Sequence, residues 1–426
     1  MAWQRNASDV SRLYCEATLW AMFQNASRRS RKTAQAEPII VYATHERKHP
    51  YAARLQRYAA TVPLLLFVAG LLSTFQALAA APATQRLDTW LSMVRQTPYW
   101  ASRGVAANLK VIRRWVLLGE SYCAGPPRHL LFDHRGRFLG YIDDGATPQD
   151  TTVRLNQVRE RLARADRVAY WSPGAQARVG YPFALACHQP FVDMEQTLAR
   201  MSGAREEYRL WGTWDGMRIG EPDRQVSLVQ LIREVFHYRQ HQGRYTFPEP
   251  LLRGLLGQIM IESGGHKNAL STRAAQGIMQ LSSEVLDDCN IPENFRRHRV
   301  AQIDCALRLT QQNHRNLLEP FMAVFGHLPA TKRDTLYGLL LAQAYQIGVE
   351  RSVELLQEPE LGNAARYLAT HHRHFSAEDI VVGMIYHNLG RKDLGLRSLF
   401  YGIDAHIAAE ALCSAASMTD DPWCAH

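Results

Sequence analysis

Residues 262–281, which read ESGGHKNALSTRAAQGIMQL, decide how the second half of the chain is interpreted. They follow an apolar run that begins after Pro248 and Pro250, and proline favours the first turn of a helix. Apolar residues recur in this run at helical spacing, at positions 251, 252, 255, 256, 259 and 260. Glu262 lies three residues after Ile259 and therefore falls on the apolar stripe. The pair Gly264-Gly265 predicts the end of the helix directly behind it.

In this position Glu262 has the features of a general acid. Desolvation and the negative end of the helix dipole both disfavour the anion, so we expect the pKa of Glu262 to be raised. A carboxylic acid that stays protonated near neutral pH is what cleavage of a glycosidic bond requires. The spacing alone favours the alternative, a glutamate that reaches solvent, because many helices end in a carboxylate without catalysing a reaction.

The residues that follow Glu262 in the sequence favour the catalytic interpretation instead. The segment resembles the signature of the soluble lytic transglycosylase family, which has Glu-Ser, a Ser nine residues after the Glu, and then Gly-Ala-x-Gly-Leu-Met-Gln. The matching residues are Glu262, Ser263, Ser271, Ala275, Gly277, Met279 and Gln280. A later family element, Tyr-Asn-Ala-Gly, appears as Tyr345-Gln346-Ile347-Gly348. The resemblance covers about residues 251–356 and implies a lysozyme-like all-α domain.

Three positions depart from the family pattern. Gly265 stands where the family usually has an aromatic residue. Ala274 replaces the first Gly of the second motif, and Gln346-Ile347 replace Asn-Ala. These changes leave the catalytic glutamate in place and predict an altered affinity for substrate.

The resemblance implies a role for each matching residue. Glu262 would be the acid and the base, Ser263 would support the loop, and Gly277 would let backbone approach backbone because it lacks a Cβ. The hydroxyl of Tyr345 would form a hydrogen bond near the carboxyl group. The residues assigned to substrate contact or to the wall of the cleft are Ser271, Met279, Gln280 and Tyr345.

The reaction that the resemblance implies needs one carboxyl group. Glu262 would protonate the oxygen between N-acetylmuramic acid and N-acetylglucosamine in peptidoglycan, and its anion would then deprotonate the C6 hydroxyl to close a 1,6-anhydro ring. No metal or cofactor is implied. A hydrolytic muramidase would need a second carboxylate, for which Asp287 and Asp288 are the nearest candidates. A third alternative is a scaffold of an envelope machine that binds glycan strands without cutting them.

The chain as a whole is predicted to be α+β, in three parts. They are a leader with a signal peptide (1–79), a small α/β or α+β accessory domain (80–224) and the all-α lysozyme-like domain (225–426). In the accessory domain we expect a helix near 87–120, strands at 129–132, 137–142 and 167–172, and a helix at 151–165. By analogy alone, such a domain beside a wall-cutting module would suit a secretion or conjugation apparatus.

The apolar stretch 62–72, followed by small residues and Ala79-Ala80, predicts a cleaved secretory signal. The alternative is an uncleaved inner-membrane anchor over 62–83. Either way, the remaining chain is expected in the periplasm. Residues 1–79 hold 10 Lys+Arg and 4 Asp+Glu, so +6 of the net charge of +9 lies there and +3 remains. This balance argues against nucleic acid as a partner and suits an anionic cell-wall polymer.

Six cysteines follow residue 79, an even number that an oxidising compartment favours. Nearest-neighbour pairing, one of fifteen possibilities, would join Cys123 with Cys187, Cys289 with Cys305, and Cys413 with Cys424. The spacings contain no Cys-x-x-Cys pair, so we expect no structural zinc.

Two features after Tyr345 have competing interpretations. The histidines 371, 372 and 374 have no carboxylate or cysteine at a regular ligand spacing, and a solvated loop is favoured over a metal site. One interpretation of Glu378 is a second glutamate that some members of the resembling family place after the tyrosine helix. A capping box of Ser376 with Asp379, which would start the next helix, is the favoured interpretation.

Overall fold

The computed structural model describes residues 97–118, 128–133, 136–165, 183–186, 193–271, 274–415, 418, 421, 423 and 424. These residues are mostly helical with two small sheets, so the fold is α+β as predicted. The predicted signal or anchor at 62–83 and the predicted strand at 167–172 lie outside the described residues. Among the described helices, none is long and apolar enough to cross a bilayer.

The first described part combines helices with a three-stranded sheet. Its elements are η2 (Tyr99–Ser102), α3 (Val105–Leu117), β1 (Arg128–Phe132), β2 (Phe138–Asp143), α4 (Pro148–Arg164) and β3 (Phe183–Ala186). The strand order is β2-β1-β3 with both pairs antiparallel, and Leu131, Ile142 and Leu162 form a small hydrophobic cluster between sheet and helix. The single helix expected near 87–120 is shorter, because Gly104 takes a positive φ of 77° between η2 and α3.

A hairpin and two helices follow. The elements are α5 (Met194–Ser202), η3 (Glu206–Tyr208), β4 (Gly212–Trp214), β5 (Met217–Ile219) and α6 (Leu228–His241). Asp193 caps α5 by accepting from the backbone N–H of Gln196, and Ser227 caps α6 through a reciprocal box with Gln230. Both helices therefore begin where the sequence supplies an oxygen for the free backbone N–H groups.

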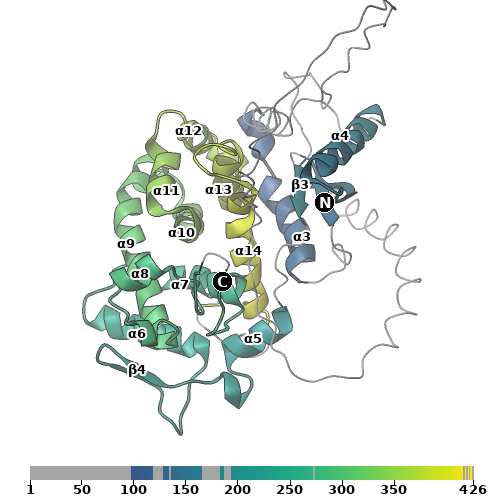
Figure 1. Ribbon diagram of the computed structural model, residues 1–426. Helices are drawn as coiled ribbons and strands as arrows, with labels where there is room; N and C mark the ends of the chain where they lie inside the picture. Colours follow the sequence, from purple (N-terminus) through teal and green to yellow (C-terminus); the bar gives the residue numbers. More distant parts are fainter. Residues whose placement is uncertain are drawn as a thin grey trace, which may run out of the picture. The chain divides into compact units, whose positions relative to one another are not determined.

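Helices continue from there to the end of the described chain (Figure 1). They are η4 (Glu249–Leu251), α7 (Leu252–Ser263), α8 (Ser283–Asp288), η5 (Glu293–Phe295), α9 (Arg299–Phe325), α10 (Ala330–Ile347), α11 (Val349–Gln357), α12 (Asn363–Thr370), η6 (His372–His374), α13 (Ala377–Tyr386) and α14 (Leu396–Cys413). The predicted capping box is only half made. Ser376 Oγ accepts from the N–H of Asp379 (2.9 Å), but the Asp379 carboxylate accepts instead from the N–H groups of Gly104 (3.0 Å) and Ala106 (2.9 Å) at the start of α3.

Two large hydrophobic clusters hold these elements together. The first joins α3 and β1 to α9 through α14, and the second joins α5, the β4–β5 hairpin, α6, α7 and the start of α9. Helix α14 contributes to both: Phe400 and Ile403 pack in the first cluster, and Tyr401 and Ala405 pack in the second. Both clusters contain side chains from before and after residue 224, so the predicted domain boundary does not coincide with a gap between them.

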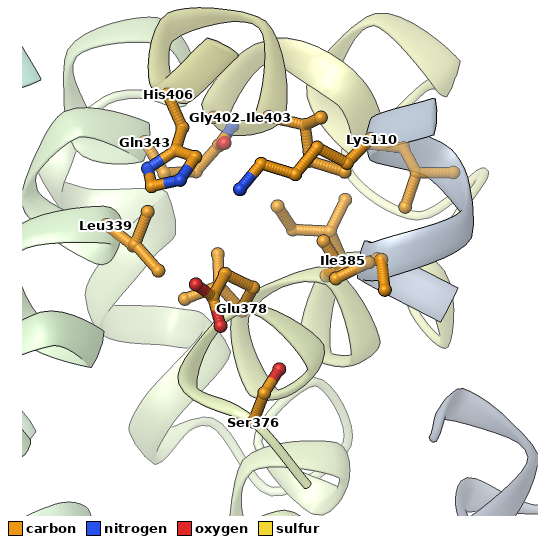
Figure 2. Close-up of a pocket in the computed structure, with 14 residues that line it drawn as sticks. Lys110, Leu339, Gln343, Ser376, Glu378, Ile385, Gly402, Ile403 and His406 are labelled. Atoms are coloured by element: carbon orange, nitrogen blue, oxygen red, sulfur yellow. The ribbon is translucent and has the colours of Figure 1, made fainter. Parts of the chain in front are cut away.

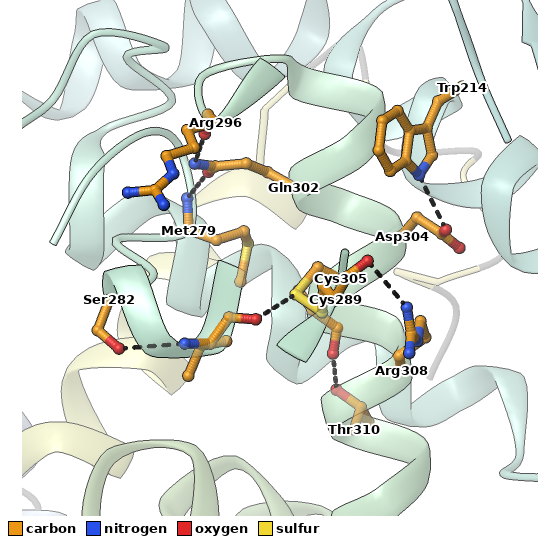
Figure 3. The surroundings of a disulfide bond; sticks show 12 residues. Trp214, Met279, Ser282, Cys289, Arg296, Gln302, Asp304, Cys305, Arg308 and Thr310 are labelled. Atoms are coloured by element: carbon orange, nitrogen blue, oxygen red, sulfur yellow. Dashed lines mark hydrogen bonds between the residues drawn. A yellow bond between two sulfur atoms is a disulfide. The ribbon is translucent and has the colours of Figure 1, made fainter. Parts of the chain in front are cut away.

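Two of the predicted disulfides are confirmed. Cys289 is bonded to Cys305, which ties the end of α8 to α9 (Figure 3), and Cys413 is bonded to Cys424. The predicted pair Cys123 and Cys187 lies outside the described residues. A disulfide that closes a loop of this size stabilises a fold by about 2–4 kcal/mol. Because disulfides persist in oxidising compartments, the two bonds are compatible with an exported protein.

Candidate active site

Glu262 is the second-to-last residue of α7, as the sequence pattern predicts. The helix ends at Gly264, whose φ of 60° is left-handed and whose N–H donates to the carbonyl of Met260 (3.0 Å). Gly265, with a φ of 76°, continues the reversal. Because both residues need a left-handed backbone, the glycine pair turns the chain sharply and leaves Glu262 at the end of a buried helix, itself only partly buried.

The carboxyl group of Glu262 has one hydrogen-bond donor that the sequence did not reveal. The Tyr401 hydroxyl, from α14, donates to Glu262 Oε1 at 2.8 Å. Burial raises the pKa of Glu262, while the hydrogen bond from Tyr401 and the positive charge of Arg397 offset part of the increase. The net direction is the one expected for a carboxyl group that can act as an acid near neutral pH.

Tyr345 approaches the same carboxyl group from α10. Its hydroxyl donates to the carbonyl oxygen of Met279 at 2.6 Å, and not to Glu262 itself. Burial raises the pKa of Tyr345 well above its ordinary value, and the negative charge of Glu262 adds to the increase. Tyr345 therefore fixes the Met279 segment beside Glu262 and stays protonated there.

The Met279 segment is held from its other side by a buried amide. Gln302, on α9, accepts from the N–H of Met279 (3.0 Å) and donates to the carbonyls of Gln276 (2.8 Å) and Arg296 (2.6 Å). A Cβ on Gly277 would lie 2.0 Å from Gln302 Nε2. The predicted reason for this glycine needs correction, because its close neighbour is the Gln302 side chain and not another backbone segment.

Ser263 and Ser271 stabilise the loop between α7 and α8. Ser263 Oγ donates to the carbonyl of Ile278 (2.7 Å) and accepts from the N–H of Gly265 (3.1 Å). Ser271 Oγ accepts from the N–H of Ala275 (3.0 Å). Both hydroxyl groups thus join segments of the loop that carries Met279.

Gln280 is folded back into the same loop with a φ of 50°. Its side-chain amide donates to the carbonyls of Gly277 (2.8 Å) and Ala269 (3.1 Å). Its Oε1 is buried and has no hydrogen-bond partner among the described residues. A buried acceptor without a donor is costly in a folded protein, so the two hydrogen bonds that the Gln280 amide donates are made at the expense of its oxygen.

Gly265, where the resembling family has an aromatic residue, faces α5 and α6. A Cβ there would lie 3.5 Å from Cβ of Arg200 and 3.6 Å from Leu228, and the Arg200 guanidinium donates to the carbonyl of Gly264 (2.7 Å). A Cβ at this position would therefore be in ordinary contact with both helices.

The two candidates for a second carboxylate do not interact with Glu262. Asp287 and Asp288, at the end of α8, are exposed, and Asp287 pairs with Arg296 at 2.8 Å. Arg397 is the charged group that acts on the pKa of Glu262. In the part of the chain that the structure describes, no three His, Cys, Asp or Glu side chains gather as a metal site would require.

Sequence reasoning missed Tyr401, Arg397 and Gln302. Tyr401 lies 139 residues from Glu262 in an apolar helix, where a tyrosine looks like any other core residue. One sequence signal was present, namely Gly257 inside the apolar helix α7. In the structure, a Cβ on this residue would lie 1.9 Å from the carbonyl oxygen of Ala405 on α14. A glycine inside an apolar helix indicates a close backbone approach, which here brings Tyr401 to Glu262.

Comparisons with known proteins identified no relative of this chain. No family model, no curated protein and no solved structure matches the chain.

Proposed function

We propose that this protein is a lytic transglycosylase that cuts the glycan strands of peptidoglycan, with Glu262 as its single acid and base. The observation that carries the proposal is the environment of this carboxyl group. It ends a buried helix, its pKa is raised by burial, and the Tyr401 hydroxyl holds it at 2.8 Å. A group with these properties can donate a proton near neutral pH and still be stabilised as an anion.

The proposed reaction uses those two states in turn. The protonated Glu262 transfers its proton to the oxygen between N-acetylmuramic acid and N-acetylglucosamine, and the bond from that oxygen to C1 breaks. The Glu262 anion then removes the proton from the C6 hydroxyl, whose oxygen bonds to C1 and closes the 1,6-anhydro ring. The carboxyl group returns to its starting state and no water is consumed.

Neither sequence candidate for a second carboxylate acts on the pKa of Glu262, which favours this reaction over hydrolysis. Glycosidases that hydrolyse usually place two carboxyl groups about 5–9.5 Å apart across the bond. Asp287 and Asp288 are exposed, and Asp287 is paired with Arg296. A ring closure by the substrate's own hydroxyl needs no residue to activate water.

The loop beside Glu262 supplies the proposed sugar contacts. Gln280, whose amide group is held in the loop by hydrogen bonds to Gly277 and Ala269, would contact the glycan, as the family resemblance implies. Met279, fixed by Tyr345 and Gln302, would form the adjacent wall. Ser271 would contact the glycan, as the family resemblance implies.

We place the reaction in the periplasm. The disulfides Cys289–Cys305 and Cys413–Cys424 favour an oxidising compartment, and the apolar stretch at 62–72 has the pattern of a secretory signal. Peptidoglycan is the proposed partner there. Service to a secretion or conjugation apparatus rests on analogy and would require a partner for the residues before α5.

The test compares the chain from Ala80 onward with its Glu262→Gln variant on purified peptidoglycan. Glu319→Gln, an exposed glutamate on α9, is the matched control. We expect 1,6-anhydro muropeptides, identified by mass spectrometry, from the unmodified chain and the control but not from Glu262→Gln. Reducing ends would establish hydrolysis instead. Glycan binding without release would establish a non-catalytic scaffold.

A further inference from the structure

A second site lies between the helix α3 and the helices α10, α13 and α14. It is a cavity of about 210 Å³, larger than the engineered cavity of roughly 150 Å³ that binds benzene. Most of its wall is aliphatic, and the main apolar residues are Leu339, Val381, Ile385, Leu399 and Ile403. Four longer polar side chains also line it: Lys110, Gln343, Glu378 and His406. An apolar cavity with a few converging polar groups is the usual form of a small-ligand site.

This cavity is distinct from the surroundings of Glu262. The residues that line it do not include Glu262, Tyr401, Tyr345 or Met279. Helix α14 separates the two: Tyr401 contacts Glu262, while Leu399, Ile403 and His406 line the cavity. One wall comes from α3, which precedes the segment that resembles the transglycosylases.

Three of the polar side chains differ in whether they have a hydrogen-bond or ion-pair partner within the protein. Figure 2 shows the Lys110 ammonium, the His406 ring and the Glu378 carboxylate pointing into the same space. Lys110 donates to Glu410 at 2.8 Å, and His406 Nε2 lies 2.9 Å from the same carboxylate oxygen. Burial and the charge of Lys110 lower the pKa of His406, so its ring is neutral near pH 7. The Lys110 charge is therefore paired with Glu410, and the His406 ring is neutral and hydrogen-bonded, without any ligand.

Glu378 is the exception. It is partly buried on the first turn of α13, and its negative charge acts on the pKa of His406, but its carboxylate has no hydrogen bond or ion pair with a described residue. A partly buried carboxylate at the wall of an apolar cavity, without a donor from the protein, can accept one from a ligand. A ligand that fits must bring a positive charge or N–H donors to the carboxylate oxygens of Glu378. Its remaining part must be aliphatic to pack against the apolar walls.

We propose that the cavity binds an aliphatic ammonium group, with the ammonium on Glu378 and the hydrocarbon chain against Val381, Ile385 and Ile403. A lysine side chain of a peptide and a free alkylamine share this chemistry. Lys110 does not oppose such a ligand, because Glu410 neutralises it at 2.8 Å. The positive charge of Lys110 would favour a carboxylate ligand only if that ion pair were broken.

The test is calorimetric titration of the full chain with n-hexylammonium, n-hexanol and hexanoate. We expect n-hexylammonium to bind at least tenfold more tightly than n-hexanol, and hexanoate to bind least. Nα-acetyl-lysine methylamide separates the two sources. Its binding would assign a peptide lysine, and its failure beside retained n-hexylammonium binding would assign a free amine. Tighter binding of hexanoate, or no binding of n-hexylammonium at millimolar concentration, would overturn the proposal.

Variants locate the site. Glu378→Gln keeps the shape of the side chain and should reduce n-hexylammonium binding at least tenfold, to the level of n-hexanol. Glu350→Gln is the matched control, because it removes an exposed glutamate from the same position of α11, the second residue of the helix. Ala107→Trp, at an exposed lining position, should block all three ligands without altering the core. Unchanged ammonium binding in Glu378→Gln or in Ala107→Trp contradicts the site.

Discussion

Replacing Tyr401 with Phe removes the hydroxyl that donates to Glu262 and keeps the buried ring. The bond is 2.8 Å long, it is partly buried, and its acceptor carries a charge in the anionic state. Hydrogen bonds to charged groups contribute about 1.5–3 kcal/mol, and each 1.36 kcal/mol is tenfold in rate. If the proposed reaction is correct, Tyr401→Phe should release anhydro-muropeptides roughly 10- to 150-fold more slowly.

The pH dependence gives a second readout of the same change. The hydrogen bond from Tyr401 lowers the pKa of Glu262 against the larger effect of burial. Without it the pKa of Glu262 rises further, so the acid form persists to higher pH. The alkaline limb of the rate profile in Tyr401→Phe should therefore move to higher pH.

Tyr345→Phe is the matched control. It removes a hydroxyl of the same kind, but this one donates to the neutral carbonyl of Met279 and not to Glu262. A bond between neutral groups contributes about 0.5–1.5 kcal/mol, so this variant should lose less activity and keep the pH profile. An unchanged rate and profile in Tyr401→Phe would refute the assigned role of Tyr401.

Two further predictions concern stability, measured by urea unfolding. Gly277→Ala should destabilise the fold by roughly 1–3 kcal/mol more than Gly243→Ala, because both positions have a positive φ but only Gly277 is crowded by Gln302; equal losses would contradict the crowding. Burial lowers the pKa of His387 to about 3, so below pH 6.5 the unfolded chain binds a proton that the folded chain does not. Stability should fall by roughly 2 kcal/mol between pH 7 and pH 5 on this account, and His387→Gln should lack that part of the loss.

The end of α7 was predictable because its determinants are local. The apolar spacing before Glu262 and the two glycines behind it set where the helix runs and where it stops. The two described disulfides also follow nearest-neighbour order, in which each bond closes a short segment. Short-range patterns of this kind need no knowledge of which helices pack together.

The partners of these local features were not predictable, because they come from distant helices. Gln302 holds the Met279 segment from α9, and Tyr401 reaches Glu262 from α14. Asp379 was expected to complete a capping box but instead caps α3, 273 residues earlier in the chain at Ala106. Each is a polar side chain whose alternative partners are equally plausible in sequence, and tertiary packing decides among them.

The helix that carries Tyr401 depends in turn on the part of the chain without a recognisable motif. Arg113, on α3, donates two hydrogen bonds to the Asp404 carboxylate, at 2.7 and 2.8 Å, and its guanidinium lies 4.1 Å from the centre of the Phe400 ring. Both partners flank Tyr401 on α14, and the ion pair is buried. Removing one member of a buried pair typically costs about 3–5 kcal/mol, because the other charge is left without a partner. Without α3, Asp404 would be that charge, so α3 is part of the structure that holds the hydroxyl of Tyr401 at Glu262.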